Sequence, residues 1–319
     1  MEKTSHIDLS VTLGGVHFKN PFLVASGTFG YGAEASAFCD INGLGGIVTK
    51  SVSWKPRPGN YPRRIVETPS GMLNSIGLAN VGVHNFVEEK LPFLANFDTN
   101  IIANIAASSI EEYCDVLKLI EANVTKNMVG YEINVSCPNV KDGGLMFGTS
   151  PDLVDELTRA LRKLTEKLLI IKLTPNVTSV APFAKVCEAA GADAISLINT
   201  VVGMSVDVFT GKPRLSTVTG GLSGPAIRPV AVAKCYEARK NSKIPIIGIG
   251  GIASAMDAME FFIVGAQLVQ VGTSNFVDPN AANDYKDELV GLLKKKNVAK
   301  FTDVVGTLNI EEVTKALGW

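Results

Sequence analysis

Short apolar runs alternate with longer amphipathic segments along nearly the whole chain. Eight runs stand out, at Phe22–Ala25, Gly46–Thr49, Asn100–Ile105, Tyr131–Val135, Leu168–Leu173, Ala194–Ile198, Pro245–Ile249 and Gln267–Val271. Each run is almost continuously apolar, which is typical of parallel strands buried on both faces. The pattern therefore predicts eight buried strands.

The segments between the runs have apolar residues at helical spacing. Five show it clearly, over residues 109–124, 150–168, 180–192, 228–242 and 254–266. The first two open with serine and acidic residues, and several of the others end at glycine or asparagine, as capped helices do. Eight alternations without a break in composition predict a single α/β domain over residues 1–319, a closed (β/α)8 TIM barrel rather than an open doubly wound sheet.

Two further segments fit around such a barrel. The stretch SVTLGGVHFKNP predicts a hairpin that turns at Gly14 and Gly15 and covers the barrel bottom. The residues from Ala281 onward predict helices packed outside the barrel.

Composition excludes several kinds of partner. The chain has 319 residues, 46% hydrophobic and 19% charged, with a formal net charge of -1. That charge gives no field to attract nucleic acid or acidic membrane. The start, MEKTSHIDLSVTLGG, lacks a signal-peptide pattern, and no apolar stretch reaches the roughly 20 residues that span a bilayer. We therefore expect a cytoplasmic protein that binds neither nucleic acid nor membrane.

The cysteines and histidines argue against a metal. The five cysteines are far apart and never form a CxxC pair, and there are only three histidines. A disulfide framework, a zinc site and an iron-sulfur cluster held by this chain alone are therefore not expected. Cys114, Cys187 and Cys235 lie in helix-like stretches and are interpreted as small buried hydrophobic residues.

Polar residues and glycines gather just after the predicted strands, where TIM barrels place their chemistry. They are Ser26, Lys50, Ser51, Asn104, Asn134, Lys172, Asn199, Thr200, Gly250, Gly251, Gly272 and Thr273. The glycines in GIGGI and VGTSN follow the last two strands, where backbone N–H groups can bind a phosphate. The ligand would be a phosphorylated substrate or a phosphate-bearing cofactor such as FMN.

Two lysines and five asparagines indicate the rest of that ligand. Lys50 and Lys172 each stand where a buried strand meets its loop, a position that favours an anion or a flavin edge. Single asparagines are usually turn residues. Five near strand ends, at Asn74, Asn104, Asn134, Asn139 and Asn199, indicate a planar polar ligand such as a pyrimidine.

Cys137 follows the fourth predicted strand in YEINVSCPNVKDG. It has three interpretations: a buried small hydrophobe, a metal ligand or a working thiol. Its loop holds no histidine or second cysteine and is punctuated by proline and asparagine, so a proton acceptor or a nucleophile is favoured. Activation by histidine has little support, because only His84 is available as a partner.

Nine motifs in order extend the interpretation. They are SGTFGYG, TKS, NSIGLAN, NVSCPNVKDGGLMFGTSP, IKLTPN, NTVVGM, GGLSGPAIRP, GIGGI and VGTSNFVDP. Together, from about Leu9 to Pro279, the chain resembles the dihydroorotate dehydrogenases, and most of all their class 1B catalytic subunits. The resemblance implies oxidation of dihydroorotate to orotate in pyrimidine biosynthesis, with FMN bound in the barrel.

The resemblance also implies roles for particular residues. Cys137 would remove a proton from substrate C5 while hydride passes from C6 to flavin N5. Substrate contacts would come from Lys50, Asn74, Ser75, Ile76, Gly77, Leu78, Asn134, Asn139, Asn199 and Thr200. FMN contacts would come from Ser26, Lys50, Ser51, Asn104, Asn134, Lys172, Ile198 and Gly224, with the phosphate on Gly250, Gly251, Gly272 and Thr273.

A class 1B subunit implies partners. It pairs with a second chain that holds FAD and a [2Fe-2S] cluster and passes electrons to NAD, and a homodimer of the present chain is also implied. Alternatives are a fumarate-linked class 1A enzyme and a flavoprotein similar to dihydropyrimidine dehydrogenase. A non-redox barrel with Lys50 or Lys172 as a Schiff-base amine is a third. The segment from Gly203 to Gly224 is a candidate cover for the site.

Overall fold

A computed structural model describes residues 7–136 and 147–311, and a barrel of parallel strands forms its centre. The barrel closes in the order β10-β13-β14-β3-β4-β7-β8-β9. The strands are β3 (Phe22–Val24), β4 (Gly46–Val48), β7 (Asn100–Ile105), β8 (Met128–Asn134), β9 (Leu168–Lys172), β10 (Ala194–Leu197), β13 (Ile246–Ile249) and β14 (Leu268–Val271). All eight predicted strands are present, and the predicted α/β barrel is confirmed.

The fourth barrel strand, β8, starts three residues before the predicted Tyr131. The difference arises at Gly130, which interrupts the apolar run in the sequence. In the structure a Cβ on Gly130 would lie 2.3 Å from the carbonyl oxygen of Leu168 on the neighbouring strand. Glycine is therefore required inside this strand by close backbone approach, although glycine usually weakens strands.

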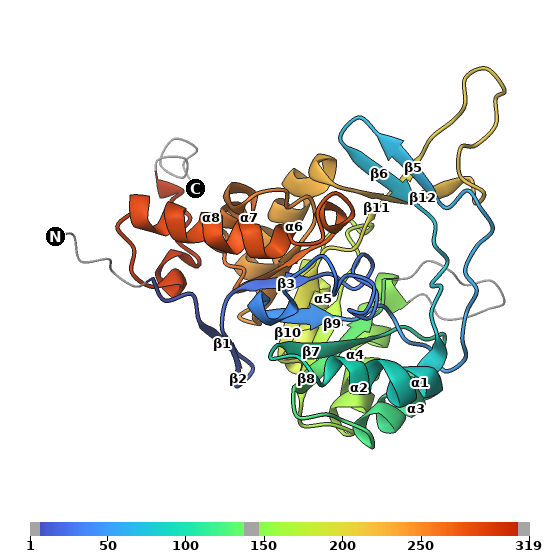
Figure 1. Cartoon of the computed structure of the whole chain (residues 1–319), viewed down its shortest axis with the longest axis horizontal. Helices are drawn as coiled ribbons and strands as arrows, with labels where there is room; N and C mark the ends of the chain where they lie inside the picture. The colour runs from blue at the N-terminus through green and yellow to red at the C-terminus, as the bar shows by residue number, and fades with distance from the viewer. Residues whose placement is uncertain (1–6, 137–146, 312–319) are drawn as a thin grey trace.

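Helices surround the barrel (Figure 1). They are α1 (Gly82–Asn85), α2 (Leu91–Leu94), α3 (Ile110–Glu121), α4 (Pro151–Arg162), α5 (Ala181–Ala189), α6 (Arg228–Asn241), α7 (Ala255–Ile263) and α8 (Ala281–Lys295). The side chains of Ser109, Ser150 and Ser254 cap α3, α4 and α7 by accepting a backbone N–H of the first turn. Across residues 7–136 and 147–311, no helix is long and apolar enough to pass through a membrane.

The predicted hairpin consists of β1 (Val11–Leu13) and β2 (Val16–Phe18). Its turn residue Gly14 has φ +55°, and a Cβ there would lie 2.5 Å from a methyl group of Leu168, at the amino end of β9. The side chain of Asn100, which begins β7, donates a hydrogen bond of 2.8 Å to the His17 carbonyl. The hairpin therefore lies at the amino ends of the barrel strands, as predicted.

A second sheet, not predicted from the sequence, lies at the opposite end of the barrel. It contains β5 (Ile65–Thr68), β6 (Gly71–Asn74), β11 (Val201–Met204) and β12 (Thr219–Ser223), all antiparallel, in the order β11-β12-β6-β5. We call it the outer sheet; Figure 1 shows it projecting beyond the barrel strands. Val66, Leu73 and Leu215 form a small separate core on it.

Candidate active site

A cavity of about 660 Å³ lies between the carboxyl ends of the barrel strands and the outer sheet. Its volume is within the range of small-molecule and cofactor sites. The predicted residues that line it are Ser26, Lys50, Ser51, Asn74, Ser75, Ile76, Gly77, Leu78, Asn134, Lys172, Ile198, Asn199, Thr200, Gly224, Gly250, Gly251, Gly272 and Thr273. The fold thus brings residues from the whole length of the chain to one site.

Three predicted residues are not among those that line the cavity. Cys137 and Asn139 lie outside the described residues. Asn104 is fully buried in the barrel below the cavity. Its side-chain oxygen accepts a hydrogen bond of 2.6 Å from the hydroxyl of Ser51, which does line the cavity. Asn104 therefore does not border the cavity itself and is connected to it through Ser51.

A buried ion pair lies at the base of the cavity. The Lys172 ammonium is 3.4 Å from Glu132 Oε1 and 3.3 Å from the Ser26 hydroxyl. Lys172 is 5% exposed and Glu132 is not exposed at all. Lys172 therefore pairs with Glu132 on one side and borders the cavity on the other. This position suits a residue that binds the anionic edge of a ligand.

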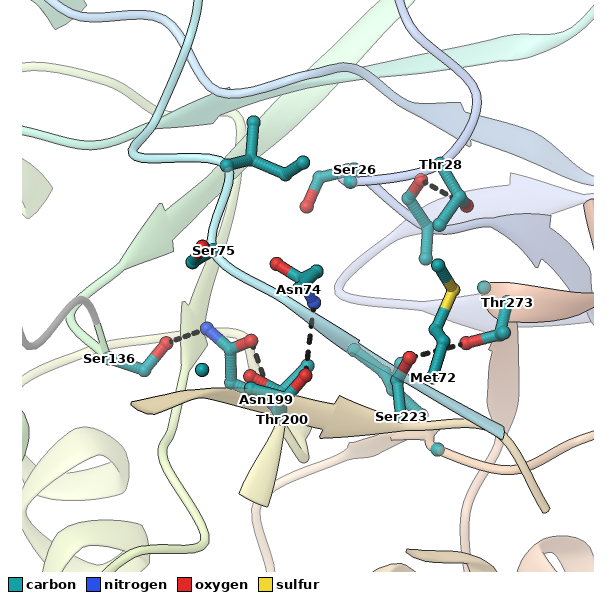
Figure 2. Close-up of a pocket in the computed structure, with 18 of the residues that line it drawn as sticks. Ser26, Thr28, Met72, Asn74, Ser75, Ser136, Asn199, Thr200, Ser223 and Thr273 are labelled. Carbon is teal, nitrogen blue, oxygen red and sulfur yellow. Dashed lines mark hydrogen bonds between the residues drawn. The ribbon is translucent and has the colours of Figure 1, made fainter. Parts of the chain in front are cut away.

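Hydrogen bonds fix the side-chain amides at the exits of β8 and β10, as Figure 2 shows for Asn199. The Asn134 oxygen accepts from the Ser136 hydroxyl at 2.6 Å and from the Asn199 amide nitrogen at 3.5 Å. The Asn199 side-chain nitrogen also donates to the Ser136 hydroxyl. The Asn199 side-chain oxygen accepts from the Thr200 N–H at 2.8 Å. Within residues 7–136 and 147–311 the Asn134 amide nitrogen has no hydrogen-bond partner, so it can donate to a ligand.

The outer sheet approaches the barrel closely at the opposite side of the cavity. The Asn74 side chain donates to the Gly221 carbonyl at 3.3 Å (Figure 2). A Cβ on Gly221 would lie only 2.0 Å from the Thr200 hydroxyl. The Ser75 hydroxyl, which lines the cavity, is buried with no hydrogen-bond partner in the part of the chain that the structure describes. Ser75 is thus ready to bond a polar ligand.

The glycine-rich end of the cavity has the geometry of a phosphate cradle. Gly250 and Gly251 have φ of +126° and +73°, and a Cβ on Gly251 would lie 2.7 Å from the backbone nitrogen of Arg228. Only glycine fits this turn without strain. The backbone at this end therefore borders the cavity with no side chain in the way, as a bound phosphate group needs.

Sequence reasoning missed several residues that line the cavity. They are Ala25, Gly27, Thr28, Asn60, Ile65, Met72, Ala79, Ser136, Asn176, Val202, Thr217, Thr219, Gly220, Gly221, Ser223, Ile227, Ile249 and Phe276. Many belong to the outer sheet or to the segment proposed as a cover. The signal available was the alternation IVETPSGMLN with its Pro-Ser-Gly turn, which predicts a hairpin at residues 65–74.

The cysteines predicted to be buried differ among themselves. Cys187 and Cys235 are fully buried, and this burial raises the pKa of both thiols. Cys114 is only partly buried, because its position on α3 is at the edge of the buried face. All three are free thiols.

Known proteins similar to this chain agree on one family. A family model described as dihydroorotate dehydrogenase matches residues 8–293. A protein of Geobacter sp. (strain M21) named dihydroorotate dehydrogenase B (NAD(+)), catalytic subunit, is 47% identical over 303 residues, 95% of this chain and 99% of that protein. Proteins of the same name from Pelobacter propionicus (48%, covering 94% of this chain and 98% of that protein) and Thermoanaerobacter sp. (46%, covering 96% and 100%) are similar.

Proposed function

The chain belongs to the dihydroorotate dehydrogenase family, and on that premise we propose that it is the catalytic subunit of a class 1B, NAD-linked enzyme that oxidises dihydroorotate to orotate. The observation that supports this most is the cavity, in which the family's polar residues and glycines converge. The barrel and outer sheet would act as one domain over residues 1–319.

The enzymes of this family depend on a flavin, and we propose FMN as the cofactor. The phosphate would be held at Gly250, Gly251, Gly272 and Thr273, and the ring by Ser26, Lys50, Ser51, Asn134, Lys172, Ile198 and Gly224, with Asn104 acting from below through Ser51. The bound flavin supplies the acceptor for the hydride that leaves C6. The residues fit it, since a buried cation, free amide donors and an unobstructed glycine turn border one cavity.

The substrate would be held by a cation and by amides. Lys50 would bind the carboxylate of dihydroorotate, an attraction strengthened in a site that excludes water. Asn74, Ser75, Ile76, Gly77, Leu78, Asn134, Asn139, Asn199 and Thr200 would contact the pyrimidine. The Ser75 hydroxyl and the Asn134 amide nitrogen support this assignment, because each belongs to a residue that lines the cavity and has no partner among the residues that the structure describes.

Cys137 would act as the general base that takes the proton from C5 of dihydroorotate. Its support is its position in the chain, three residues after Asn134, which ends β8 and lines the cavity. A positioned base of this kind contributes roughly 10²- to 10⁴-fold to a rate. The amide network of Asn134, Ser136 and Asn199 would hold the backbone that leads into Cys137.

The name of the relatives, catalytic subunit, supports a partner chain for electron transfer. We propose that this partner holds FAD and a [2Fe-2S] cluster, that the present chain also pairs with itself, and that the assembly is cytoplasmic. Size measurement of the chain alone and mixed with its partner tests the assembly. Reduction of NAD by dihydroorotate only in the mixture is the expected result, and equal reduction of fumarate by the chain alone would contradict it.

A substrate panel tests the proposed specificity. The purified protein, anaerobic and loaded with FMN, is mixed with dihydroorotate or with dihydrouracil, which lacks the carboxylate. We expect dihydroorotate to reduce the flavin and dihydrouracil to leave it oxidised. We also expect Lys50→Met to weaken dihydroorotate binding. Equal reduction by dihydrouracil would contradict the role of Lys50 and favour a dihydropyrimidine dehydrogenase.

A further inference from the structure

We propose that Glu132 is a positioning residue that acts through Lys172 and sets the charge beneath the bound flavin; the inference rests on the proposed FMN site. Glu132 is on β8 and points into the barrel interior, where it is fully buried. It is absent from the residues that line the cavity. Its influence on a ligand therefore has to pass through its partners.

Four donors surround the Glu132 carboxylate. Oε1 accepts from the Asn104 amide at 2.7 Å and from the Lys172 ammonium at 3.4 Å. Oε2 accepts from the Ser196 hydroxyl at 2.9 Å and from the Gln270 amide at 2.6 Å. These partners come from β7, β9, β10 and β14, so one carboxylate joins strands from both sides of the barrel.

A carboxylate matches this arrangement better than an amide does. It offers acceptor positions on both oxygens and no donor, whereas a glutamine would turn an NH₂ group toward two of the donors. The hydrogen bonds hold Glu132 in one orientation, and Glu132 in turn fixes where the Lys172 ammonium lies. The same oxygen orients Asn104, which accepts from Ser51 on the cavity wall.

A gain in stability is a weak explanation for burying the Glu132 carboxylate inside the barrel. The interior of a TIM barrel is usually filled by layers of branched apolar side chains. A buried ion pair is often no more stabilising than apolar residues of similar volume. The Gln270 oxygen is also buried without a hydrogen-bond partner in the described part of the chain, an unfavourable feature that packing alone would not select. Lys172, by contrast, reaches the cavity where a cofactor ring would lie.

The charges of Glu132 and Lys172 predict how the midpoint potential of bound FMN differs among variants of these two residues. With both residues present, the positive and negative charges at the base of the cavity nearly cancel. Glu132→Gln leaves the cation unbalanced and favours electron uptake, and Lys172→Met leaves the anion unbalanced and opposes it. We therefore expect the midpoint potential of bound FMN to rise in E132Q, fall in K172M and return close to that of the unchanged protein in the double variant.

The measurement is a spectroscopic redox titration of each FMN-loaded variant, with thermal unfolding as a check on folding. Glu121→Gln is the matched control, because Glu121 accepts hydrogen bonds from Tyr131 and Thr165 and does not line the cavity. E121Q is expected to leave the potential unchanged. If E132Q does not fold, Ser196→Ala, which removes one donor from Glu132 outside the cavity, is expected to lower the potential, because the carboxylate charge is then less neutralised.

An E132Q potential equal to or below that of the unchanged protein would overturn the inference, as would a double variant whose potential stays far from that of the unchanged protein. An unchanged potential in S196A would also overturn the inference. A protein that takes up no flavin would contradict the proposed function and this inference together. A flavoprotein that oxidises dihydroorotate but lacks the predicted order of potentials would contradict this inference alone.

Discussion

Ser223 on the outer sheet and Thr273 at the exit of β14 share a hydrogen bond, with 2.9 Å between their hydroxyl oxygens (Figure 2). Ser223 ends β12, which pairs with β6, so this bond ties the outer sheet to the barrel rim. Both residues line the cavity at its glycine-rich end. The outer sheet is therefore attached to the barrel where the proposed phosphate site lies.

Ser223→Ala is expected to loosen this attachment. One hydrogen bond is worth about 0.5–1.5 kcal/mol, or roughly 2- to 12-fold in an equilibrium. We expect faster release of FMN and faster amide hydrogen exchange over residues 219–223, with little change in the unfolding temperature of the barrel. Stopped-flow release of FMN and hydrogen exchange measure these effects.

Ser216→Ala is the matched control for this change. The Ser216 hydroxyl donates to the Tyr61 carbonyl at 2.7 Å in an exposed place, and Ser216 does not line the cavity. FMN release in S216A should match that of the unchanged protein. If FMN release were accelerated equally in S216A and S223A, the hydrogen bond between Ser223 and Thr273 would have no specific role in holding FMN.

Gly221→Ala tests the close contact between the outer sheet and the barrel. A Cβ at this position would lie 2.0 Å from the Thr200 hydroxyl, too close for any real atom. Because the contact is at the cavity wall, we expect a raised KM for dihydroorotate and a displaced outer sheet. Gly291→Ala in α8 is the control, since its Cβ meets nothing within 4 Å and alanine favours helix. A KM unchanged in G221A would contradict a rigid contact here.

The barrel could be predicted from the sequence, because each buried strand is a continuous apolar run and the polar residues follow it. The outer sheet could not be predicted in the same way. In β5 only Val66 is buried, between the exposed Ile65 and Glu67, so the strand has no apolar run. The strand β11 pairs with β12, which begins after a long loop. Pairing between strands far apart in the chain leaves only a weak local pattern.

Contacts between residues far apart in the chain also decide which parts of the candidate site could be predicted. Lys172 and Asn134 could be predicted from their places at strand ends. Glu132 could not, because in the apolar run YEINV it is a single charge whose four partners lie on other strands. The orientation of the Asn134 amide likewise depends on Ser136 and Asn199, which only the fold brings together.

Glu237 predicts a pH dependence of stability. Burial raises the pKa of its carboxyl, but hydrogen bonds from Ser179, Lys234 and the Val180 N–H outweigh burial, so the pKa is lowered overall. A lowered folded pKa gives stability that is present above the ordinary value of about 4.3 and is lost as pH falls through the folded pKa. Glu237→Gln should therefore cost about 1.5 kcal/mol of unfolding free energy at pH 7.

Denaturant unfolding at pH 7 and below pH 4 measures this prediction. The gap between E237Q and the unchanged protein should narrow as the pH falls through the folded pKa of Glu237, because both side chains are then neutral. Asp155→Asn is the control, because its pairing with Arg159 is largely exposed and exposed ion pairs contribute little to stability. A gap that does not vary with pH would rule out the carboxylate charge as the cause.

Cys137→Ala is expected to slow flavin reduction by roughly 10²- to 10⁴-fold, because the proposed base is removed. Cys137→Ser should keep part of the rate and shift it toward high pH, since a hydroxyl is a poorer base. Cys114→Ala on α3 is the control and should reduce at the normal rate. Rapid-mixing absorbance at neutral pH measures all three, and a normal rate in C137A would remove Cys137 from the mechanism.

The proposed function requires that dihydroorotate gives its electrons to a flavin in the cavity. The most direct test is an anaerobic titration of the purified protein with dihydroorotate, followed by flavin absorbance and by identification of the released cofactor and product. We predict a yellow protein whose absorbance is bleached stoichiometrically, with FMN and orotate recovered. A colourless protein, or a flavin that dihydroorotate leaves oxidised, would contradict the account.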